Sequence, residues 1–194
     1  MKILAFVDVH GNRSAIKRLI EASKEVDLII CAGDLTVFEN DAEELLESLA
    51  EFKQTVYMIP GNHESAELLG KLKSKFPYVF DLHRKVLSLP DIELVGYGQG
   101  GFSLVDKDFE RFTHNYARQN KNRLVLVTHA PPYNTKLDEL GHEHHGNKSL
   151  REFIERHKPE LVICGHFHEN HGKSDHIGAT IVVNPGPNGM IIEL

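Results

Sequence analysis

Five short runs of β-branched and other apolar residues recur along the chain, and a polar residue follows each run almost at once. The runs cover residues 3–7, 28–31, 56–59, 124–127 and 161–164. Continuous apolar runs of this length, bounded by Gly, Pro or polar residues, are typical of strands that are buried on both faces. We therefore expect five buried strands.

Segments with apolar residues at helical spacing lie between these runs. Leu45, Leu46 and Leu49 show this spacing in one segment. Asn12 is a suitable N-cap for the first segment, and Pro159 follows the end of the last. The predicted helices cover residues 13–25, 41–52, 64–75 and 148–157, with a weaker helical pattern over 108–119.

The alternation of strands and helices predicts an α/β fold with largely parallel strands. Segments 77–97 and 176–194 show short strands and turn residues without a helical pattern, so we expect mixed or antiparallel pairing there. The length of 194 residues fits a single domain, 1–194. Sites in open α/β sheets form beyond the carboxyl ends of the strands, so the five polar endings should converge on one edge.

Composition narrows the location and the partners. The formal net charge is −6 and no cluster of Lys and Arg is present, so we expect no nucleic acid partner. No apolar run approaches the roughly 18 residues of a membrane helix. The first strand begins too close to Met1 to leave room for a signal peptide, so we expect a cytoplasmic protein. Cys31 and Cys164 are too few for a disulfide framework and should be small buried side chains.

Histidine is unusually frequent, with 13 in the chain, and several stand beside Asp, Asn or Gly where the apolar runs end. Each motif is weak alone, because a lone His is more often structural and a Gly-Asp pair is usually a turn. Their joint occurrence at strand ends indicates a metal site. The motifs are Asp8-Val9-His10, Gly33-Asp34, Gly61-Asn62-His63-Glu64, Thr128-His129 and Gly165-His166-Phe167-His168.

These residue types suit metal binding. Asp8 and His10 are two positions apart, so in an extended chain their side chains would point the same way, and the pair 166 and 168 repeats this spacing. Asp34 has two carboxylate oxygens that can bridge two ions, and Asn62 offers a neutral carbonyl oxygen. Imidazole and carboxylate together suit Mn, Fe, Zn, Ni or Co rather than Ca or Mg alone.

The set of motifs resembles that of the calcineurin-like metallophosphoesterase superfamily. It is most similar to the small single-domain prokaryotic members, which are related to cyclic-nucleotide phosphodiesterases. The resemblance extends from Asp8 to the Asn184-Pro185-Gly186 turn, and every metal-ligand position is filled. It implies a four-layer αββα sandwich of two mixed β-sheets flanked by helices, which agrees with the pattern of strands and helices.

The resemblance also implies a dinuclear metal centre, with Mn as the preferred ion and Fe, Ni, Zn or Co as alternatives. It implies that Asp34 bridges the ions and that His63 is the catalytic histidine. One ion would be bound by Asp8, His10, Asp34 and His168, and the other by Asp34, Asn62, His129 and His166.

Charge counting favours the same chemistry. Two divalent ions, two carboxylates and a bridging hydroxide leave a net charge of about +1, which favours an anionic phosphate ester. Metals lower the pKa of bound water, so a bridging hydroxide can be the nucleophile near neutral pH, and ions about 3.5–4 Å apart can support in-line displacement. We therefore expect a phosphoesterase, foremost a phosphodiesterase, that acts on a small phosphate ester.

His63 is not assigned as a ligand, so we expect it to bind the phosphate or protonate the leaving oxygen. A helix is predicted to begin directly after it, and the N-terminus of that helix would favour a nearby anion. Glu64 has two interpretations: it orients His63, or it is a first-turn acid stabilised by the helix dipole. Asn12 would contact the phosphate or only cap the first helix.

Residues 130–147 form a long loop after His129, of the kind that often covers an active site. In this loop, His144 or His145 is expected to line the cleft as a substrate-binding residue rather than to hold a third metal ion. Its rim should be acidic because of Asp138, Glu139 and Glu143.

Two alternative functions remain. The same fold can serve as a non-catalytic protein-interaction scaffold, but such scaffolds have an eroded ligand set and lack the catalytic histidine, whereas His63 is present here. A nuclease is disfavoured by the acidic charge and the lack of a basic groove. The sequence leaves open the substrate, monoesterase against diesterase activity, the native metal pair and the oligomeric state, for which a homodimer is one option.

Overall fold

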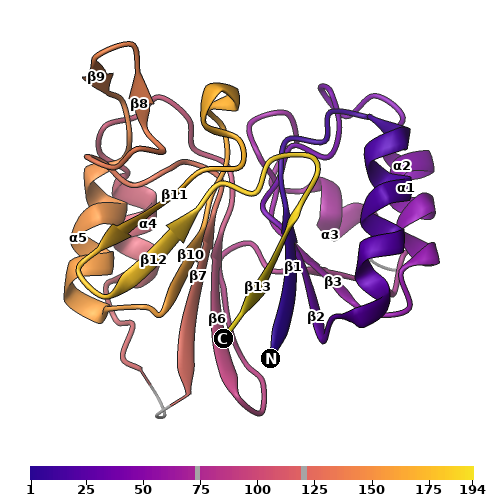
Figure 1. The fold of residues 1–194 in the computed structure, drawn as a ribbon, viewed down its shortest axis with the longest axis horizontal. Helices are drawn as coiled ribbons and strands as arrows, with labels where there is room; N and C mark the ends of the chain where they lie inside the picture. The colour runs from indigo at the N-terminus through magenta and orange to yellow at the C-terminus, as the bar shows by residue number, and fades with distance from the viewer. Residues whose placement is uncertain (73–74, 119–121) are drawn as a thin grey trace.

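The computed structural model describes residues 1–72, 75–118 and 122–194, and it contains two β-sheets packed face to face with helices on their outer faces (Figure 1). The helices α1, α2 and α3 cover one sheet, and α4 and α5 cover the other. This arrangement confirms the predicted α/β class and the four-layer sandwich.

The first sheet has the order β13-β1-β2-β3-β4. Strands β1 to β4 run parallel, and β13 pairs antiparallel with β1 at the edge. The strands are β1 Lys2–Phe6, β2 Leu28–Cys31, β3 Val56–Met58, β4 Val79–Asp81 and β13 Met190–Glu193.

The second sheet has the order β11-β12-β10-β7-β6-β5. The four inner strands are parallel, and the two edge strands β5 and β11 pair antiparallel. The largely parallel core and the mixed pairing in 77–97 and 176–194 are both confirmed. The strands are β5 Lys85–Ser88, β6 Ile92–Tyr97, β7 Arg123–Thr128, β10 Leu161–Ile163, β11 Ser174–Ile177 and β12 Thr180–Val183; the small hairpin of β8 Glu139–Leu140 and β9 Glu143–His144 stands apart.

Three of the helical predictions agree closely with the structure, and two were too long. The predicted helix 64–75 begins only at Leu68, after two turn residues, and the weaker 108–119 pattern ends at Thr113; positions 73–74 and 119 lie outside the described residues. No helix in the described ranges is long and apolar enough to cross a membrane. The helices are α1 Arg13–Ala22, η1 Ser23–Glu25, α2 Ala42–Ser48, η2 Leu49–Glu51, α3 Leu68–Leu72, α4 Lys107–Thr113, α5 Lys148–His157 and η3 His168–Asn170.

Three apolar layers hold the sandwich together, and β1 shows how its sequence serves two of them. Leu4 and Phe6 pack toward the helices, whereas Ile3, Ala5 and Val7 pack between the two sheets. This follows from the period of two in a strand. Full burial of a Leu, Ile or Phe side chain contributes about 1.5–3 kcal/mol. The strands are therefore fixed on both faces, and their polar ends are held in place with them.

The two cysteines behave as the sequence predicts. Cys31 ends β2 and Cys164 follows β10, and both are free and buried. Burial raises the pKa of both thiols, because a thiolate would be poorly solvated there. Both side chains are structural in this state.

Candidate metal centre

The carboxyl ends of β1, β2, β3, β7 and β10 meet at the upper edge of the two sheets in Figure 1. The loops that follow these strands carry all seven predicted ligand residues. Contacts of 4.0 Å or less join these residues into one cluster. The seven residues are Asp8, His10, Asp34, Asn62, His129, His166 and His168.

One half of the cluster is built around two facing imidazoles. The Nε2 atoms of His10 and His168 lie 3.1 Å apart, and both rings lie near a carboxylate oxygen of Asp8. The Nδ1 atom of His10 is 3.2 Å from the carbonyl oxygen of Thr36, to which it donates its hydrogen in the neutral ring. The lone pair of Nε2 then faces the cluster, as in a metal-binding histidine whose other nitrogen is held by the backbone.

The other half is built around His129, which is fully buried. Its Nδ1 atom is 2.9 Å from the carbonyl oxygen of Ala32, and its Nε2 atom is 3.0 Å from Oδ1 of Asn62. The same Asn62 oxygen is 2.9 Å from Nδ1 of His166. Two ring nitrogens thus meet one amide oxygen, a donor set that suits a borderline divalent ion.

Asp34 lies between the two halves. Its Oδ2 atom is 3.3 Å from Nε2 of His129 and 3.8 Å from Nε2 of His10. Its Oδ1 atom accepts a hydrogen bond from the backbone amide of His63 at 2.9 Å. One carboxylate oxygen therefore faces both candidate sites, which is the geometry that a bridging ligand requires.

The electrostatics of the cluster favour a bound cation. Burial opposes ionisation of His129, but its hydrogen bond to Asp34 and the charges of Asp34 and Asp8 prevail and raise its pKa to about 9. Burial likewise disfavours ionisation of Asp34, yet His129 keeps the pKa of Asp34 below its usual value. Burial and His129 lower the pKa of His166 to about 4, so this ring is neutral and free to coordinate.

The backbone that presents the ligands is not extended, contrary to the prediction. Asp8, His10, Asp34 and His166 have positive φ angles of 55°, 47°, 53° and 74°. His168 is the first residue of η3. Simple alternation along a strand therefore does not explain why these side chains converge. Left-handed non-glycine residues cost on the order of 1 kcal/mol each or more and concentrate at functional sites.

Glu64 has neither of the roles that the sequence suggested. Its side chain is buried, and Oε2 accepts hydrogen bonds from the backbone amides of Asp34 at 2.9 Å and Gly61 at 2.8 Å. Its Oε1 atom accepts from the amide and the hydroxyl of Thr36, both at 2.8 Å. Glu64 therefore joins the loops after β2 and β3, and it positions Asp34 rather than His63.

His63 stands at the edge of the cluster. Its Nε2 atom is 3.9 Å from Oδ2 of Asp34, and its ring centroid is 4.7 Å from that of His10. The Nδ1 atom is buried and has no hydrogen-bond partner among the described residues. The expected helix start beside His63 is absent, because α3 begins only at Leu68.

Asn12 caps α1, which is one of the two roles considered for it. Its Oδ1 atom accepts hydrogen bonds from the Ala15 amide at 3.0 Å and the Ser14 hydroxyl at 2.7 Å. The side-chain oxygen is therefore engaged by the helix that it begins.

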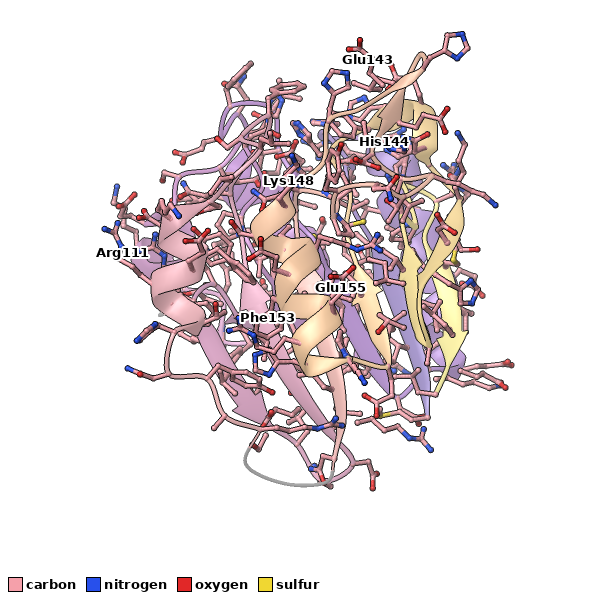
Figure 2. All side chains as sticks on the ribbon, turned by 90° about the vertical axis from the view of Figure 1, so that its left-hand side faces the viewer. Arg111, Glu143, His144, Lys148, Phe153 and Glu155 are labelled. Atoms are coloured by element: carbon pink, nitrogen blue, oxygen red, sulfur yellow. The ribbon has the colours of Figure 1, made fainter. Side chains whose placement is uncertain are left out.

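His144 and His145 contact acidic residues of their own loop. Nδ1 of His144 lies 2.9 Å from Oδ1 of Asp138, and His145 lies 3.8 Å from Glu143. His144 belongs to β9 of the β8–β9 hairpin, and Figure 2 shows it above the end of α5 where Lys148 begins the helix. Asp138 is fully buried, so the prediction that it makes the rim acidic was wrong.

His171, which closely follows the His166–His168 motif in the sequence, also contacts the cluster. Its Nε2 atom lies 2.9 Å from Oδ2 of Asp8 and can hold that carboxylate in place. Gly186 makes this possible, since a Cβ atom there would lie 2.9 Å from Cβ of His171. The spacing of three between His168 and His171, which spans one 3₁₀ turn, is the signal that would have found it.

Comparison with known proteins gives consistent matches. The model of the calcineurin-like phosphoesterase family matches residues 1–170. An uncharacterized protein of Methanocaldococcus jannaschii is 33% identical over 205 residues, covering 99% of this chain and 91% of that protein. A probable cyclic nucleotide phosphodiesterase of Coxiella burnetii is 26% identical over 170 residues, covering 84% and 68%. The structure of TT1561 from Thermus thermophilus has a TM-score of 0.77 at 18% identity, covering 96% and 90%, a likeness of fold.

Proposed function

From the premise that the chain belongs to the calcineurin-like phosphoesterase family and is a metal-dependent phosphoester hydrolase, we propose that it is a dinuclear phosphodiesterase for small phosphate esters. The observation that carries this proposal is the position of Asp34. One of its oxygens lies between the imidazoles of His10 and His129, which belong to the two halves of the cluster.

The donor set fits two divalent ions, and Mn²⁺ is the ion that we propose. His10 and His129 each direct one ring nitrogen to a backbone carbonyl and the other to the cluster. Bound ions would supply Lewis acidity and lower the pKa of a bound water. One ion would be held by Asp8, His10, Asp34 and His168, and the other by Asp34, Asn62, His129 and His166.

His63 would act on the substrate. Its Nε2 atom lies 3.9 Å from Oδ2 of Asp34, on the side of the ring that faces the candidate metal ligands. A proton there can be donated to a phosphate oxygen or to the leaving oxygen. The hydrogen bond from the backbone amide of His63 to Asp34 would hold the two residues at a fixed distance during this step.

A small substrate is the better match to the charge of the protein. The formal net charge is −6, and a long polyanion would have to be held without a compensating excess of Lys and Arg. A single phosphate ester needs only the local positive charge of the metal centre. The choice of diester over monoester rests on the name of the Coxiella burnetii relative.

The test is hydrolysis of bis(4-nitrophenyl) phosphate and 4-nitrophenyl phosphate by protein loaded with Mn²⁺. We expect the diester to be cleaved faster. We expect His63→Ala to lower kcat by about 100-fold or more, the usual range for loss of a general acid. His176→Ala is the matched control, because His176 is an exposed imidazole on β11 outside the cluster. Absence of hydrolysis of any monoester or diester, with metal confirmed bound, would exclude the proposed function.

A further inference from the structure

Exposed apolar side chains gather in two loops near the metal centre. Among the described residues, seven large apolar side chains are exposed, and five of them belong to these loops. The other two, Val86 and Ile191, lie on edge strands β5 and β13. Exposed patches of this kind usually mark a binding surface. The loop residues are Val37, Phe38, Phe102, Leu104 and Val105, and we call Phe38 and Phe102 the aromatic rim.

Phe38 is 72% exposed, and its ring centroid lies 4.3 Å from that of His63. It occupies a tight turn in which the Asn40 amide donates to the Val37 carbonyl at 3.0 Å. The φ angles of Phe38 and Glu39 are +51° and +61°, as in a type I′ turn that favours Gly and Asn. A bulky ring in this conformation is unfavourable for folding, which points to a function for the side chain.

The turn is fastened to the segment that carries His63. The Ser65 amide donates to Oε1 of Glu39 at 2.7 Å, and the Glu39 amide donates to Oγ1 of Thr36 at 3.2 Å. The hydroxyl of Thr36 in turn donates a hydrogen bond to Glu64. These bonds hold the Phe38 turn and His63 together, so the ring keeps a defined place beside the histidine.

Phe102 borders the opposite half of the cluster. It is 75% exposed, and its ring centroid lies 4.7 Å from that of His166. The loop is anchored to the start of α5, because Nδ2 of Asn147 donates to the Ser103 carbonyl at 2.9 Å and the Lys148 amide donates to the Leu104 carbonyl at 2.8 Å. Two exposed phenyl rings, one from each sheet's loops, therefore flank the metal centre.

We propose that the aromatic rim binds a flat aromatic group of the phosphoester, an aryl group or a nucleobase, and so determines substrate preference. This inference rests on the proposed function. A phosphate held beside His63 places its directly bonded ester group within reach of Phe38, which already touches that histidine. Both rings pack on an imidazole and leave most of their surface to solvent, so a flat ring can pack against them.

The test compares ligands that carry the same phosphate. Dissociation constants of phenyl phosphate, butyl phosphate and inorganic phosphate are measured by calorimetry on the Mn²⁺-loaded protein. A second pair, a nucleoside 5′-monophosphate and ribose 5-phosphate, tests the nucleobase. We expect the ring-bearing ligand to bind about fivefold more tightly in at least one pair, as aromatic packing typically provides. The pair that shows the preference identifies the source of the ring.

Phe38→Gly is the most informative variant. Glycine suits a positive φ, so the fold should keep or raise its melting temperature while the ring is lost. In the double variant Phe38→Gly/Phe102→Leu, we expect the ratio of the two dissociation constants in the discriminating pair to fall toward one. The dissociation constant of inorganic phosphate should stay within about twofold of wild type. Val86→Ala, which removes an exposed apolar side chain elsewhere, should keep the full preference.

Three results would overturn the inference: no preference in either pair, equal weakening of inorganic phosphate and phenyl phosphate, or a change from dimer to monomer in Phe38→Gly without any change in preference. The last result would make the rim a contact between copies of the chain. If Mn²⁺-loaded protein cleaves bis(4-nitrophenyl) phosphate but shows no preference, only this inference fails. If it cleaves no phosphoester, the proposed function fails first.

Discussion

Two buried carboxylates, Glu64 and Asp138, have the same chemistry in different places. Each carboxylate accepts hydrogen bonds from three backbone amides and from a threonine hydroxyl. For Glu64 the amides belong to Asp34, Thr36 and Gly61, and for Asp138 they belong to Asn134, Thr135 and Gly146.

The difference is in what each carboxylate joins. Glu64 ties the loop after β2 to the loop after β3, and its partners lie up to 30 positions away. Asp138 ties together only its own loop, with partners at most eight positions away. Both should stabilise the fold, because a buried carboxylate that satisfies several amides is costly to remove. Only Glu64 should also support the metal centre.

Glu64→Ala should therefore have the largest effect. Three buried amides lose their acceptor, so we expect the free energy of unfolding to fall by about 3 kcal/mol or more. Asp34 loses its support, so Mn²⁺ affinity should fall by about tenfold or more, a typical cost of removing a residue that orients a ligand. Urea unfolding and calorimetric Mn²⁺ titration measure the two effects. The exposed acid Glu67 supplies the control variant Glu67→Ala; normal Mn²⁺ affinity in Glu64→Ala would contradict the comparison.

Asp138→Ala should separate stability from metal binding. The loss of three amide acceptors again predicts a decrease of about 3 kcal/mol in the free energy of unfolding. Mn²⁺ affinity should stay within about twofold of wild type, because no metal-ligand candidate is bonded to Asp138 and distant sites are usually independent. The same two measurements apply. A fall in Mn²⁺ affinity as large as in Glu64→Ala would show that the two regions are coupled.

The pH dependence of Mn²⁺ affinity should further distinguish the Glu64 region from the Asp138 region, because this dependence originates in the surroundings of Asp34. The pKa of His129 is raised to about 9, so below that pH a metal ion must displace one proton. Mn²⁺ affinity should rise about tenfold per pH unit between pH 7 and 9. His166, with a pKa near 4, adds nothing in this range. Titrations at several pH values measure the slope, and a flat profile would mean that His129 is already neutral.

The same raised pKa affects the metal-free protein with the opposite dependence on pH. The proton on His129 stabilises the fold fully below the unfolded pKa of about 6.5. This contribution is lost as the pH rises through about 9.

His144→Ala should have the smallest effect. His144 is partly exposed and bonded to Asp138, so we expect a loss of about 1 kcal/mol in stability or less. If the 130–147 loop only shapes the cleft, kcat/KM for bis(4-nitrophenyl) phosphate should change less than about threefold. His145→Ala is the neighbouring control. A selective tenfold loss in His144→Ala would instead place this imidazole against the substrate.

The sequence predicted best where local and tertiary signals agree. Helix α5 matches its predicted bounds, because Asn147 caps its start, its apolar face is regular and Pro159 follows its end. The buried strands were found for the same reason, since an apolar run of four or five residues has few other uses in a globular protein. The convergence of the seven candidate ligands followed from the position of these strand ends.

The failures occurred where tertiary hydrogen bonds override local pattern. Glu64 looks like the first acid of a helix, but its carboxylate is used by loop amides and the helix starts at Leu68. Asp8 and His10 converge through left-handed backbone that no alternation rule predicts. Phe38 carries no periodic signal, because its placement depends on a strained turn.

The burial of Cys31 and Cys164 has a practical consequence for identifying the native metals. Both thiols are enclosed and resist ionisation, and the chain has no other cysteine. Purification therefore needs no dithiothreitol or similar reductant, which would compete for soft metal ions. Elemental analysis of protein prepared in this way would report the ions acquired in the cell.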